Sequence, residues 1–347
     1  VASGEVKREM SIAPLLNDHK DTTKIALNKN FEPIELVASE SLPQNLKVQN
    51  LNILPKKISI LSPLDYAQIL VMADLGNGRE SDVTRMVKWS IPQKIGNIDN
   101  RGLFTPVQDG KAVIKATFGE YTASVEVSIS GINKSYQPEY ISEVNPIISK
   151  LGCNAGTCHG AKDGKNGFKL SLRGYDALYD IRGFTDDMAS RRVNIAAPER
   201  SLMLLKATGT VPHEGGQLTK GDSRYHRVIR SWIGDGAGLD MKAKRVTEIK
   251  LYPENPVVEE IGATQQFRVV AFYDNGMIKD VTREAFVTSG NGEVAEHDEL
   301  SLMTTLRRGE APILARFEGR YAATTLTVMG DRTGFVWKEP SHHNRID

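Results

Sequence analysis

The chain has 347 residues, more than one ordinary hydrophobic core organises, so two or three domains are expected. Lys plus Arg (44) nearly balance Asp plus Glu (43), and this balance argues against a nucleic-acid-binding protein. No apolar run approaches the roughly 18 residues that span a bilayer, and the start at Val1 has neither an initiator Met nor the apolar core of a signal peptide.

Residues 1–46 are polar and weakly patterned, so this N-terminal segment is given no fold or role. The first clear pattern occupies residues 47–132 and recurs about 200 residues later, in residues 247–330. In each copy a turn containing Asn and Gly precedes the tetrapeptide Asp-Val-Thr-Arg, at Asp82–Arg85 in the first copy and Asp280–Arg283 in the second. Because Asn-Gly steps favour tight hairpin turns, both copies predict a hairpin that leads into a strand.

Alternating apolar residues continue both copies as strands of period two. These strands lie at 112–118 and 125–129 in the first copy, and at 313–317 and 326–328 in the second. Several short strands with frequent turns predict an antiparallel β-sandwich in each copy. The two copies resemble the bacterial Ig-like domains of group 2, a family found in cell-envelope proteins. Neither copy contains a cysteine, so an inter-sheet disulfide is excluded.

Between the copies, residues 138–240 show helical periodicity. A first amphipathic helix is predicted to end at Cys153, because apolar residues recur before it at three- and four-residue spacing. A second helix is predicted to be capped by Asp222 or Ser223 and to stop at Gly234. The apolar positions of the two helices are Ile141, Val144, Ile147, Ile148 and Leu151, then Tyr225, Val228, Ile229 and Trp232.

The two cysteines of the chain, Cys153 and Cys158, belong to a Cys-x4-Cys-His string that His159 completes. Covalent haem attachment needs two thiols that add to the porphyrin vinyl groups, followed directly by a His that binds the iron. The usual string is Cys-x2-Cys-His, and here two extra residues enlarge the loop around the small Ala155 and Gly156. The string therefore predicts one haem c bound through Cys153 and Cys158, with His159 as an iron ligand.

Parts of this middle region resemble the planctomycete-type cytochrome c domain. The matching stretches are Pro146–Cys153, Ala197–Leu202 and Ser231–Ala237. The resemblance implies a small all-α class I cytochrome c fold, of a kind that occurs beside Ig-like modules. It also implies that residues 331–347 are a linker to a further domain, so the chain is expected to be a fragment of a larger planctomycete cell-envelope protein.

The second iron ligand is less directly indicated. Members of this family carry Met-Pro-Pro before the last helix, whereas this chain has Val211-Pro212-His213 at the corresponding place. We therefore expect His213 to bind the metal opposite His159, and bis-histidine ligation would lower the reduction potential. Met203 and Met188 are rival ligands, and a His213 that only forms hydrogen bonds would leave the iron five-coordinate.

Other interpretations of these residues remain open. A plain Cys153–Cys158 disulfide is sterically allowed in an oxidising compartment, and a zinc site would need His159 and His213 as further ligands. Lys162, Lys165 and Lys169 either attract an acidic redox partner or form a solvated face. The remaining histidines are interpreted as surface residues: His19, His226, His297, His342 and His343.

The predicted fold class is multidomain, with two all-β Ig-like sandwiches at 47–132 and 247–330 flanking a small all-α class I cytochrome c-like domain at 138–240. The predicted function is one-electron transfer by a non-enzymatic c-type cytochrome in the periplasm or on the extracellular cell envelope. An unidentified redox protein is the expected partner, with envelope polysaccharide or protein contacts through the Ig-like domains. The alternatives are an adhesion or scaffold protein with a Cys153–Cys158 disulfide, and a haem-based sensor or peroxidase with an open iron site.

Overall fold

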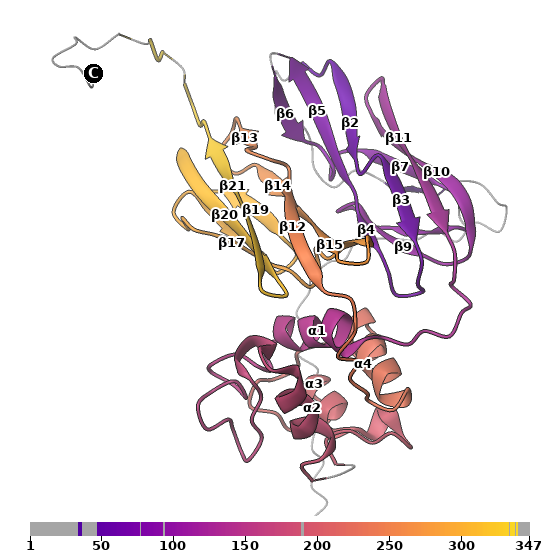
Figure 1. The fold of residues 1–347 in the computed structure, drawn as a ribbon. Coiled ribbons are helices and arrows are strands. Elements are labelled where there is room, and N and C mark those ends of the chain that lie inside the picture. The colour runs from indigo at the N-terminus through magenta and orange to yellow at the C-terminus, as the bar shows by residue number, and fades with distance from the viewer. Residues whose placement is uncertain are drawn as a thin grey trace, which may run out of the picture. The chain divides into compact units, whose positions relative to one another are not determined.

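A computed structural model describes residues 34–36, 47–76, 78–92, 94–188, 191–332, 334–336 and 338 (Figure 1). Apart from the first 32 residues, the contacts of the chain belong to one compact unit, Pro33–Asp347. The predictions for segment 1–46 and for linker 331–347 fall largely outside the described residues. None of the described helices is long and apolar enough to cross a bilayer.

The first β-sandwich contains strands β1 to β11 in three sheets, of strand orders β1-β7-β10-β11-β3, β2-β5-β6 and β4-β9-β8. Most neighbouring strands are antiparallel, whereas β3 runs parallel to β11. The strands are β1 (Ile34–Leu36), β2 (Asn50–Leu54), β3 (Lys57–Ile60), β4 (Ala67–Gln68), β5 (Leu70–Gly76), β6 (Arg79–Asp82), β7 (Lys88–Ile91), β8 (Gly96–Ile98), β9 (Leu103–Pro106), β10 (Gly110–Phe118) and β11 (Tyr121–Ile129).

The second β-sandwich repeats this topology with strands β12 to β21, in the orders β13-β21-β20-β17, β12-β15-β16 and β14-β19-β18. Each strand from β2 to β11 has its counterpart ten strands later, and β13 is parallel to β21 as β3 is to β11. The strands are β12 (Val246–Tyr252), β13 (Val257–Val258), β14 (Thr264–Gln266), β15 (Arg268–Tyr273), β16 (Ile278–Asp280), β17 (Phe286–Ser289), β18 (Ala295–His297), β19 (Leu302–Thr305), β20 (Gly309–Phe317) and β21 (Arg320–Val328).

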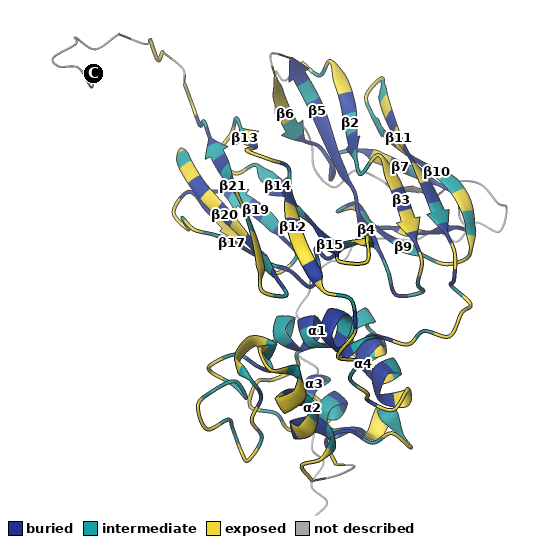
Figure 2. Ribbon diagram, viewed as in Figure 1, coloured by how far each residue is buried: buried dark blue, intermediate teal, exposed yellow. Residues whose placement is uncertain are grey.

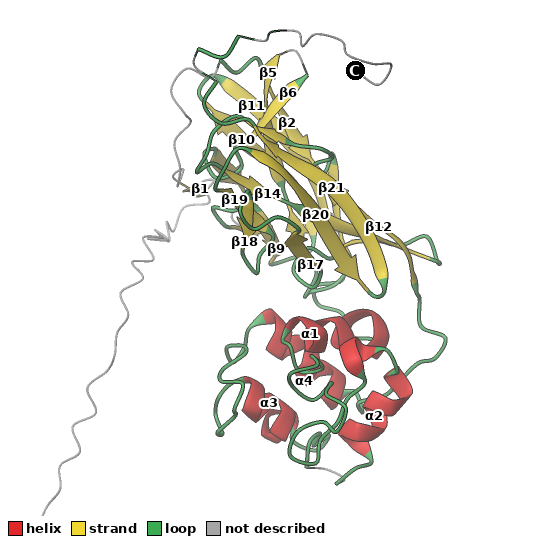
Figure 3. Cartoon of the chain, turned by 90° about the vertical axis from the view of Figure 1, so that its left-hand side faces the viewer, coloured by secondary structure: helices red, strands yellow, loops and turns green. Residues whose placement is uncertain are grey.

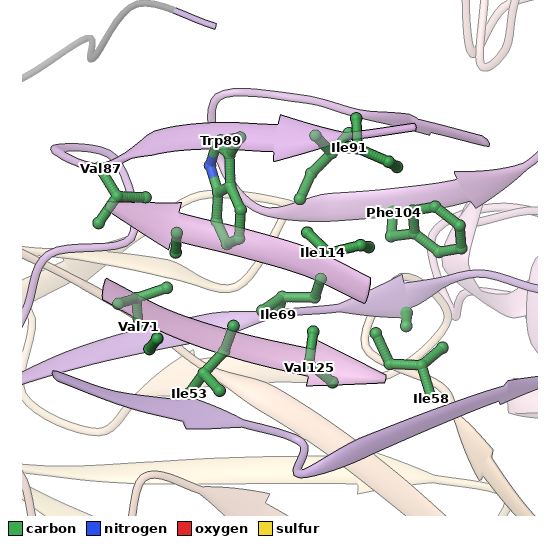
Figure 4. Close-up of a cluster of buried hydrophobic side chains, with 14 of the residues drawn as sticks. Ile53, Ile58, Ile69, Val71, Val87, Trp89, Ile91, Phe104, Ile114 and Val125 are labelled. Carbon is green, nitrogen blue, oxygen red and sulfur yellow. The ribbon is translucent and has the colours of Figure 1, made fainter. Parts of the chain in front are cut away.

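The core of each sandwich follows from the alternation of apolar and polar residues along its strands. In β11, every second residue from Ala123 to Ile129 is buried, and Figure 2 shows the same alternation along neighbouring strands. Figure 4 shows side chains from β2, β5, β7 and β10 gathered into the first core, where Trp89 and Ile114 are almost completely buried. Packing alone holds this core, because neither cysteine of the chain lies in it.

The residues between the sandwiches, 140–234, contain all the described helices, and we call them the helical segment (Figure 3). Its apolar positions form a third core around Ile147, Leu204 and Trp232. The α-helices are α1 (Asn145–Lys150), α2 (Ala177–Thr185), α3 (Leu202–Ala207) and α4 (Arg224–Gly234); a π-helical turn covers Tyr140–Val144, and 3-10 turns cover Leu172–Gly174 and Pro198–Arg200.

The predicted second helix is confirmed as α4, with Ser223 as its N-cap and Gly234 as its last residue. The Ser223 side chain accepts a hydrogen bond from the backbone N–H of His226 at 3.3 Å. The predicted first helix is shorter than expected. It begins afresh at Asn145, because Pro146 has no N–H to continue the preceding turn, and Gly152 ends it with a φ of +78°.

The predicted fold class is wrong in its central part. The chain consists mostly of β-sandwiches, and the region between them is not an all-α class I cytochrome c-like domain. Its α-helices have only 6 to 11 residues, and residues 151–171 form turns without a helix. The apolar spacing before Cys153 indicated helical structure correctly, but it could not show how much of the region the helices would occupy.

Candidate functional site

The four predicted site residues line one cavity of about 690 Å³ in the helical segment. Cys153, Cys158 and His159 come from the loop after α1, and His213 comes from the loop between α3 and α4. The rest of the lining is mainly apolar and includes Ile148, Leu151, Phe168, Phe184, Leu202 and Ile229. The sequence prediction that these four side chains share one site is therefore consistent with the fold, although their roles stay a prediction.

Consecutive tight turns hold the cysteine loop. The backbone N–H of Cys153 donates to the carbonyl oxygen of Ile148 at 3.1 Å, and the N–H of His159 donates to the carbonyl oxygen of Cys153 at 3.0 Å. A Cβ atom at Gly160 would collide with the carbonyl oxygen of Asn154, so this position requires glycine. The loop therefore keeps Cys153 and His159 close together.

Both cysteines are free thiols in the structure. Burial, together with a smaller effect of Cys158, raises the pKa of Cys153 to about 12. Cys153 is consequently a protonated and weakly nucleophilic thiol at neutral pH. Cys153 and Cys158 line the same cavity.

His159 and His213 are each held by a backbone carbonyl. The Nδ1 atom of His159 lies 3.0 Å from the carbonyl oxygen of Phe168, and its ring centroid lies 4.6 Å from that of Phe168. Partial burial lowers the pKa of His159 below its usual value, so the ring is neutral at neutral pH. The Nδ1 atom of His213 lies 3.1 Å from the carbonyl oxygen of Gly216.

The two methionines considered as rival iron ligands lie in the cavity, whereas the remaining described histidines lie elsewhere. Met203 and Met188 both line the cavity, whereas His226 lies at the start of α4, where its Nδ1 atom accepts the N–H of Asp222. His297 is exposed on β18. The interpretations of His19, His342 and His343 fall outside the described residues. Lys165 forms an ion pair with Glu214 at 3.0 Å, while Lys162 and Lys169 are exposed.

Sequence reasoning missed the contact between the two sandwiches, which we call the repeat interface: Gln68, Asp82, Gln266 and Asp280. The backbone N–H of Gln68 donates to Asp280 Oδ2 at 2.9 Å, and the N–H of Gln266 donates to Asp82 Oδ2 at 2.7 Å. All four residues are buried. The unchanged Asp-Val-Thr-Arg in both copies was the available signal, but it was interpreted only as part of a hairpin.

A second missed cluster joins the helical segment to both sandwiches, and we call it the junction: Tyr66, Arg224 and Glu284. The Tyr66 hydroxyl donates to Glu284 Oε2 at 2.7 Å, and Arg224 Nη1 forms an ion pair with Glu284 Oε1. Nearby, Lys279 Nζ lies 2.8 Å from both Asp65 Oδ1 and Glu143 Oε1. These buried ionic contacts fix the helical segment against the two sandwiches.

Comparisons with known proteins find no matching family model. One curated relative is ice-binding protein 1 of Shewanella frigidimarina (strain NCIMB 400), which is 23% identical over 270 residues. The match covers 75% of this chain but only 27% of the relative, so the chain spans about a quarter of that protein's length.

Solved structures of surface layer protein SbsC also match. Domains 5–6 share 8% identity at a TM-score of 0.32 and cover 82% of this chain and 98% of theirs. Domains 1–6 share 10% identity at a TM-score of 0.23, covering 82% of this chain and 28% of theirs. Scores of this size do not establish a shared fold.

These findings correct the cytochrome interpretation. No family model supports the resemblance to a planctomycete-type cytochrome c domain or to the group 2 Ig-like domains, and the curated relative is an ice-binding protein. Within the described ranges, no group of three or more His, Cys, Asp or Glu side chains could hold a metal ion. The predicted haem c, its redox partner and the electron-transfer function are therefore withdrawn. The predicted location is retained only as extracellular or cell-surface.

Proposed function

We propose that this chain is a non-enzymatic scaffold segment of an extracellular or cell-surface adhesion protein, with its two sandwiches held as one rigid pair. The observation that carries the proposal is the repeat interface. Asp82 and Asp280 each accept a buried backbone N–H from the opposite copy, so neither sandwich turns without breaking both bonds. Flexible tandem domains do not need such reciprocal buried contacts.

Each interface carboxylate is also anchored within its own copy. The hydroxyls of Thr84 and Thr282 donate to Asp82 Oδ1 and Asp280 Oδ1 at 2.5 and 2.7 Å. Arg85 Nη1 lies 3.0 Å from Asp82 Oδ2, and Arg268 Nε lies 2.9 Å from Asp280 Oδ2. The carboxylates are therefore fixed before they meet the opposite copy, which makes the joint stiff.

In this proposal the helical segment is a structural part of the scaffold, closed by a Cys153–Cys158 disulfide. An extracellular location favours oxidation of two neighbouring thiols. A disulfide that closes so short a loop would stabilise the fold by about 2 kcal/mol in the chain-entropy estimate. Its effect is to hold the loop after α1, which carries no regular structure of its own.

We infer that this chain has a structural role and does not itself bind ice. The chain matches about a quarter of the ice-binding relative, and the outward residues of β10 and β11 include Lys111, Lys115 and Glu126, which are charged and exposed. Charged side chains retain their own hydration shells, so this face is a poor template for ice. We therefore expect the isolated chain not to partition into growing ice.

The rigidity of the pair can be measured by electron spin resonance between two labels. Ser124→Cys on β11 and Ala323→Cys on β21 place labels at exposed positions of the two sandwiches, with Cys153→Ser and Cys158→Ser removing the native thiols. We expect one narrow distance distribution. Adding Asp82→Ala and Asp280→Ala should broaden it.

The matched control replaces Asp74 and Asp274 with Ala. Asp74 lies in β5 and Asp274 in the turn between β15 and β16, and both lie outside the repeat interface. The control should keep the narrow distribution. A broad distribution in the parent protein would show that the sandwiches move independently and would exclude a rigid scaffold.

A further inference from the structure

The cavity of the helical segment has a largely apolar wall. Its volume is about 690 Å³, and Ile148, Phe184 and Ile229 belong both to its lining and to the third core. These three side chains are almost completely buried. A water molecule inside a protein needs about two to four polar partners, which this part of the wall does not provide. Pockets for small organic molecules typically measure roughly 300–1,000 Å³, so the cavity suits an apolar ligand.

One side of the cavity is accessible from outside the protein. Met188, which is 55% exposed, lines this side together with the exposed Glu214 and Gly215. Met203 on α3 lines the cavity as well. Methionine is unbranched and adapts its shape to a neighbouring apolar group, so the wall can close around a flexible ligand.

Positive charge dominates the described lining of the cavity. The lining cations are Lys165, Arg191, Arg192 and Lys206, and the lining carboxylate is Glu214. Lys165 is neutralised by its ion pair with Glu214. Arg192 is held by the carbonyl oxygens of Gly183 and Gly167 at 2.7 and 2.9 Å, with Asp187 at 3.7 Å. The guanidinium group of Arg192 is therefore already engaged within the protein.

Arg191 and Lys206 keep donors for a ligand. Lys206 Nζ donates to the carbonyl oxygen of Pro212 at 3.0 Å, and Arg191 is exposed. Neither forms an ion pair with another residue that the structure describes. The Arg191 carbonyl oxygen accepts the N–H of Leu202 at 3.2 Å, and Leu202 precedes Lys206 by one turn of α3. Both cations thus belong to the α3 side of the cavity, where they can bind a carboxylate.

We propose that this cavity binds a long-chain fatty acid. The acyl chain lies against the apolar wall, and the carboxylate accepts hydrogen bonds from Arg191 and Lys206. A fatty acid has one charged end and an otherwise apolar body, which matches a cavity whose uncompensated charges lie at these two residues. The inference goes beyond the scaffold, because it gives the helical segment a ligand. Spin-label distances test the scaffold without any ligand, so the two proposals fail independently.

The first part of the test varies the ligand and keeps the full chain unchanged. Calorimetric titration with laurate, below the concentration at which it forms micelles, should show one molecule bound per chain. Caprate is shorter by two methylene groups and should bind about tenfold more weakly, because less apolar surface is buried. Lauryl alcohol has the same chain without the charge and should also bind about tenfold more weakly or worse. Dodecyltrimethylammonium, with the opposite charge, should bind least.

The second part varies the charges of the cavity. Arg191→Gln combined with Lys206→Gln should weaken laurate binding by about tenfold or more and leave lauryl alcohol binding within about twofold. A purely structural role of the two residues would change both ligands equally. The control pair, Arg200→Gln with Arg227→Gln, removes two exposed charges that do not line the cavity, and laurate affinity should stay within about twofold.

The third part varies the volume of the cavity. Ala207→Phe places a ring in the cavity and should abolish binding of both laurate and lauryl alcohol, whereas Ala196→Phe adds the same ring at an exposed position outside the lining and should not. Unchanged far-ultraviolet circular dichroism in each variant shows that folding is intact. Three results overturn the proposal: no binding of laurate, equal affinity for laurate and lauryl alcohol in the unchanged chain, or laurate binding that Ala207→Phe leaves intact.

Discussion

Asp82 and Asp280 make the same hydrogen bond in opposite directions, each accepting a backbone N–H of the other sandwich at 2.7 and 2.9 Å. The donors, Gln266 and Gln68, are themselves equivalent residues of the two copies. Their side chains repeat the symmetry: Gln68 Nε2 donates to the carbonyl oxygen of Arg101, and Gln266 Nε2 donates to that of Leu300. The two copies therefore meet through one surface used twice, as in a symmetric dimer.

Asp280→Ala should lower the free energy of unfolding by about 2–4 kcal/mol, because several buried donors lose their acceptor together. The donors are the N–H of Gln68, the N–H and hydroxyl of Thr282, and Arg268 Nε. Urea unfolding followed by tryptophan fluorescence measures the change. Asp163→Ala is the control, since Asp163 is exposed in a turn, and an equal loss there would contradict the interface argument.

The sequence indicated the repeat because its evidence is local. Strand β10, Gly110–Phe118, and the end of β21 at Val328 agree with the predicted strands at 112–118 and 326–328. The repeat interface was not predictable in the same way, because it depends on how one copy lies against the other. Nothing in the sequence around Asp82 distinguishes an aspartate in a turn from an aspartate whose buried carboxylate accepts a hydrogen bond.

The cysteine string shows the opposite case. Local spacing grouped Cys153, Cys158 and His159, the family resemblance added His213, and all four residues line one cavity. The same spacing led to a wrong fold class, because adjacency of two thiols and an imidazole does not specify a long helical framework.

The junction was missed for a third reason. Glu284 follows Asp-Val-Thr-Arg where the first copy has Met86, and a single difference between the repeats does not indicate which residue Glu284 contacts.

Lys279→Met should destabilise the fold by about 3 kcal/mol at neutral pH, because it leaves the carboxylates of Asp65 and Glu143 buried without their cation. Lys250→Met is the control: the Lys250–Glu248 pair is half-exposed with a 4.0 Å separation, and its loss should cost less than about 0.5 kcal/mol. Equal effects in urea unfolding would show that the buried pair has no special role.

The cluster of Asp65, Glu143 and Lys279 should also make the free energy of unfolding depend on pH below neutrality. Burial alone would raise the pKa of Glu143, but Lys279 and a backbone hydrogen bond hold it below the usual value. The unfolded chain then binds protons more readily, so this stabilisation is complete above the ordinary glutamate pKa of about 4.3 and is lost as pH falls through the lower folded pKa. Glu143→Gln should flatten the acid side of a stability profile measured by urea unfolding. An unchanged acid slope would contradict this assignment.

Glu318 should have the opposite effect on the pH dependence, because its ionisation destabilises the fold as pH rises. Burial raises the pKa of this carboxyl to about 8, although Arg245 and Lys244 oppose the shift. The folded state therefore holds a proton that the unfolded state releases near its ordinary pKa of about 4.3, and stability falls as pH rises from there to about 8. Glu318→Gln should raise the free energy of unfolding at pH 9 by at least about 1 kcal/mol and leave it nearly unchanged at pH 4. A gain of equal size at both pH values would point to an effect other than titration. The exposed Glu120, in the equivalent hairpin of the first copy, provides the control substitution Glu120→Gln.

The scaffold interpretation predicts that Cys153 and Cys158 are oxidised to a disulfide after export, although the structure has them as thiols. Thiol titration of the denatured, exported protein should find no free thiols before reduction and two after it. The double variant Cys153→Ser, Cys158→Ser should have a free energy of unfolding about 2 kcal/mol lower. Two thiols before reduction would show that the pair stays reduced. No thiols even after reduction, together with a Soret band that the double variant lacks, would instead mean that both sulfurs are thioether-bound to haem. The reduction step thus separates the disulfide from thioether chemistry, because dithiols cleave S–S bonds and leave thioethers intact.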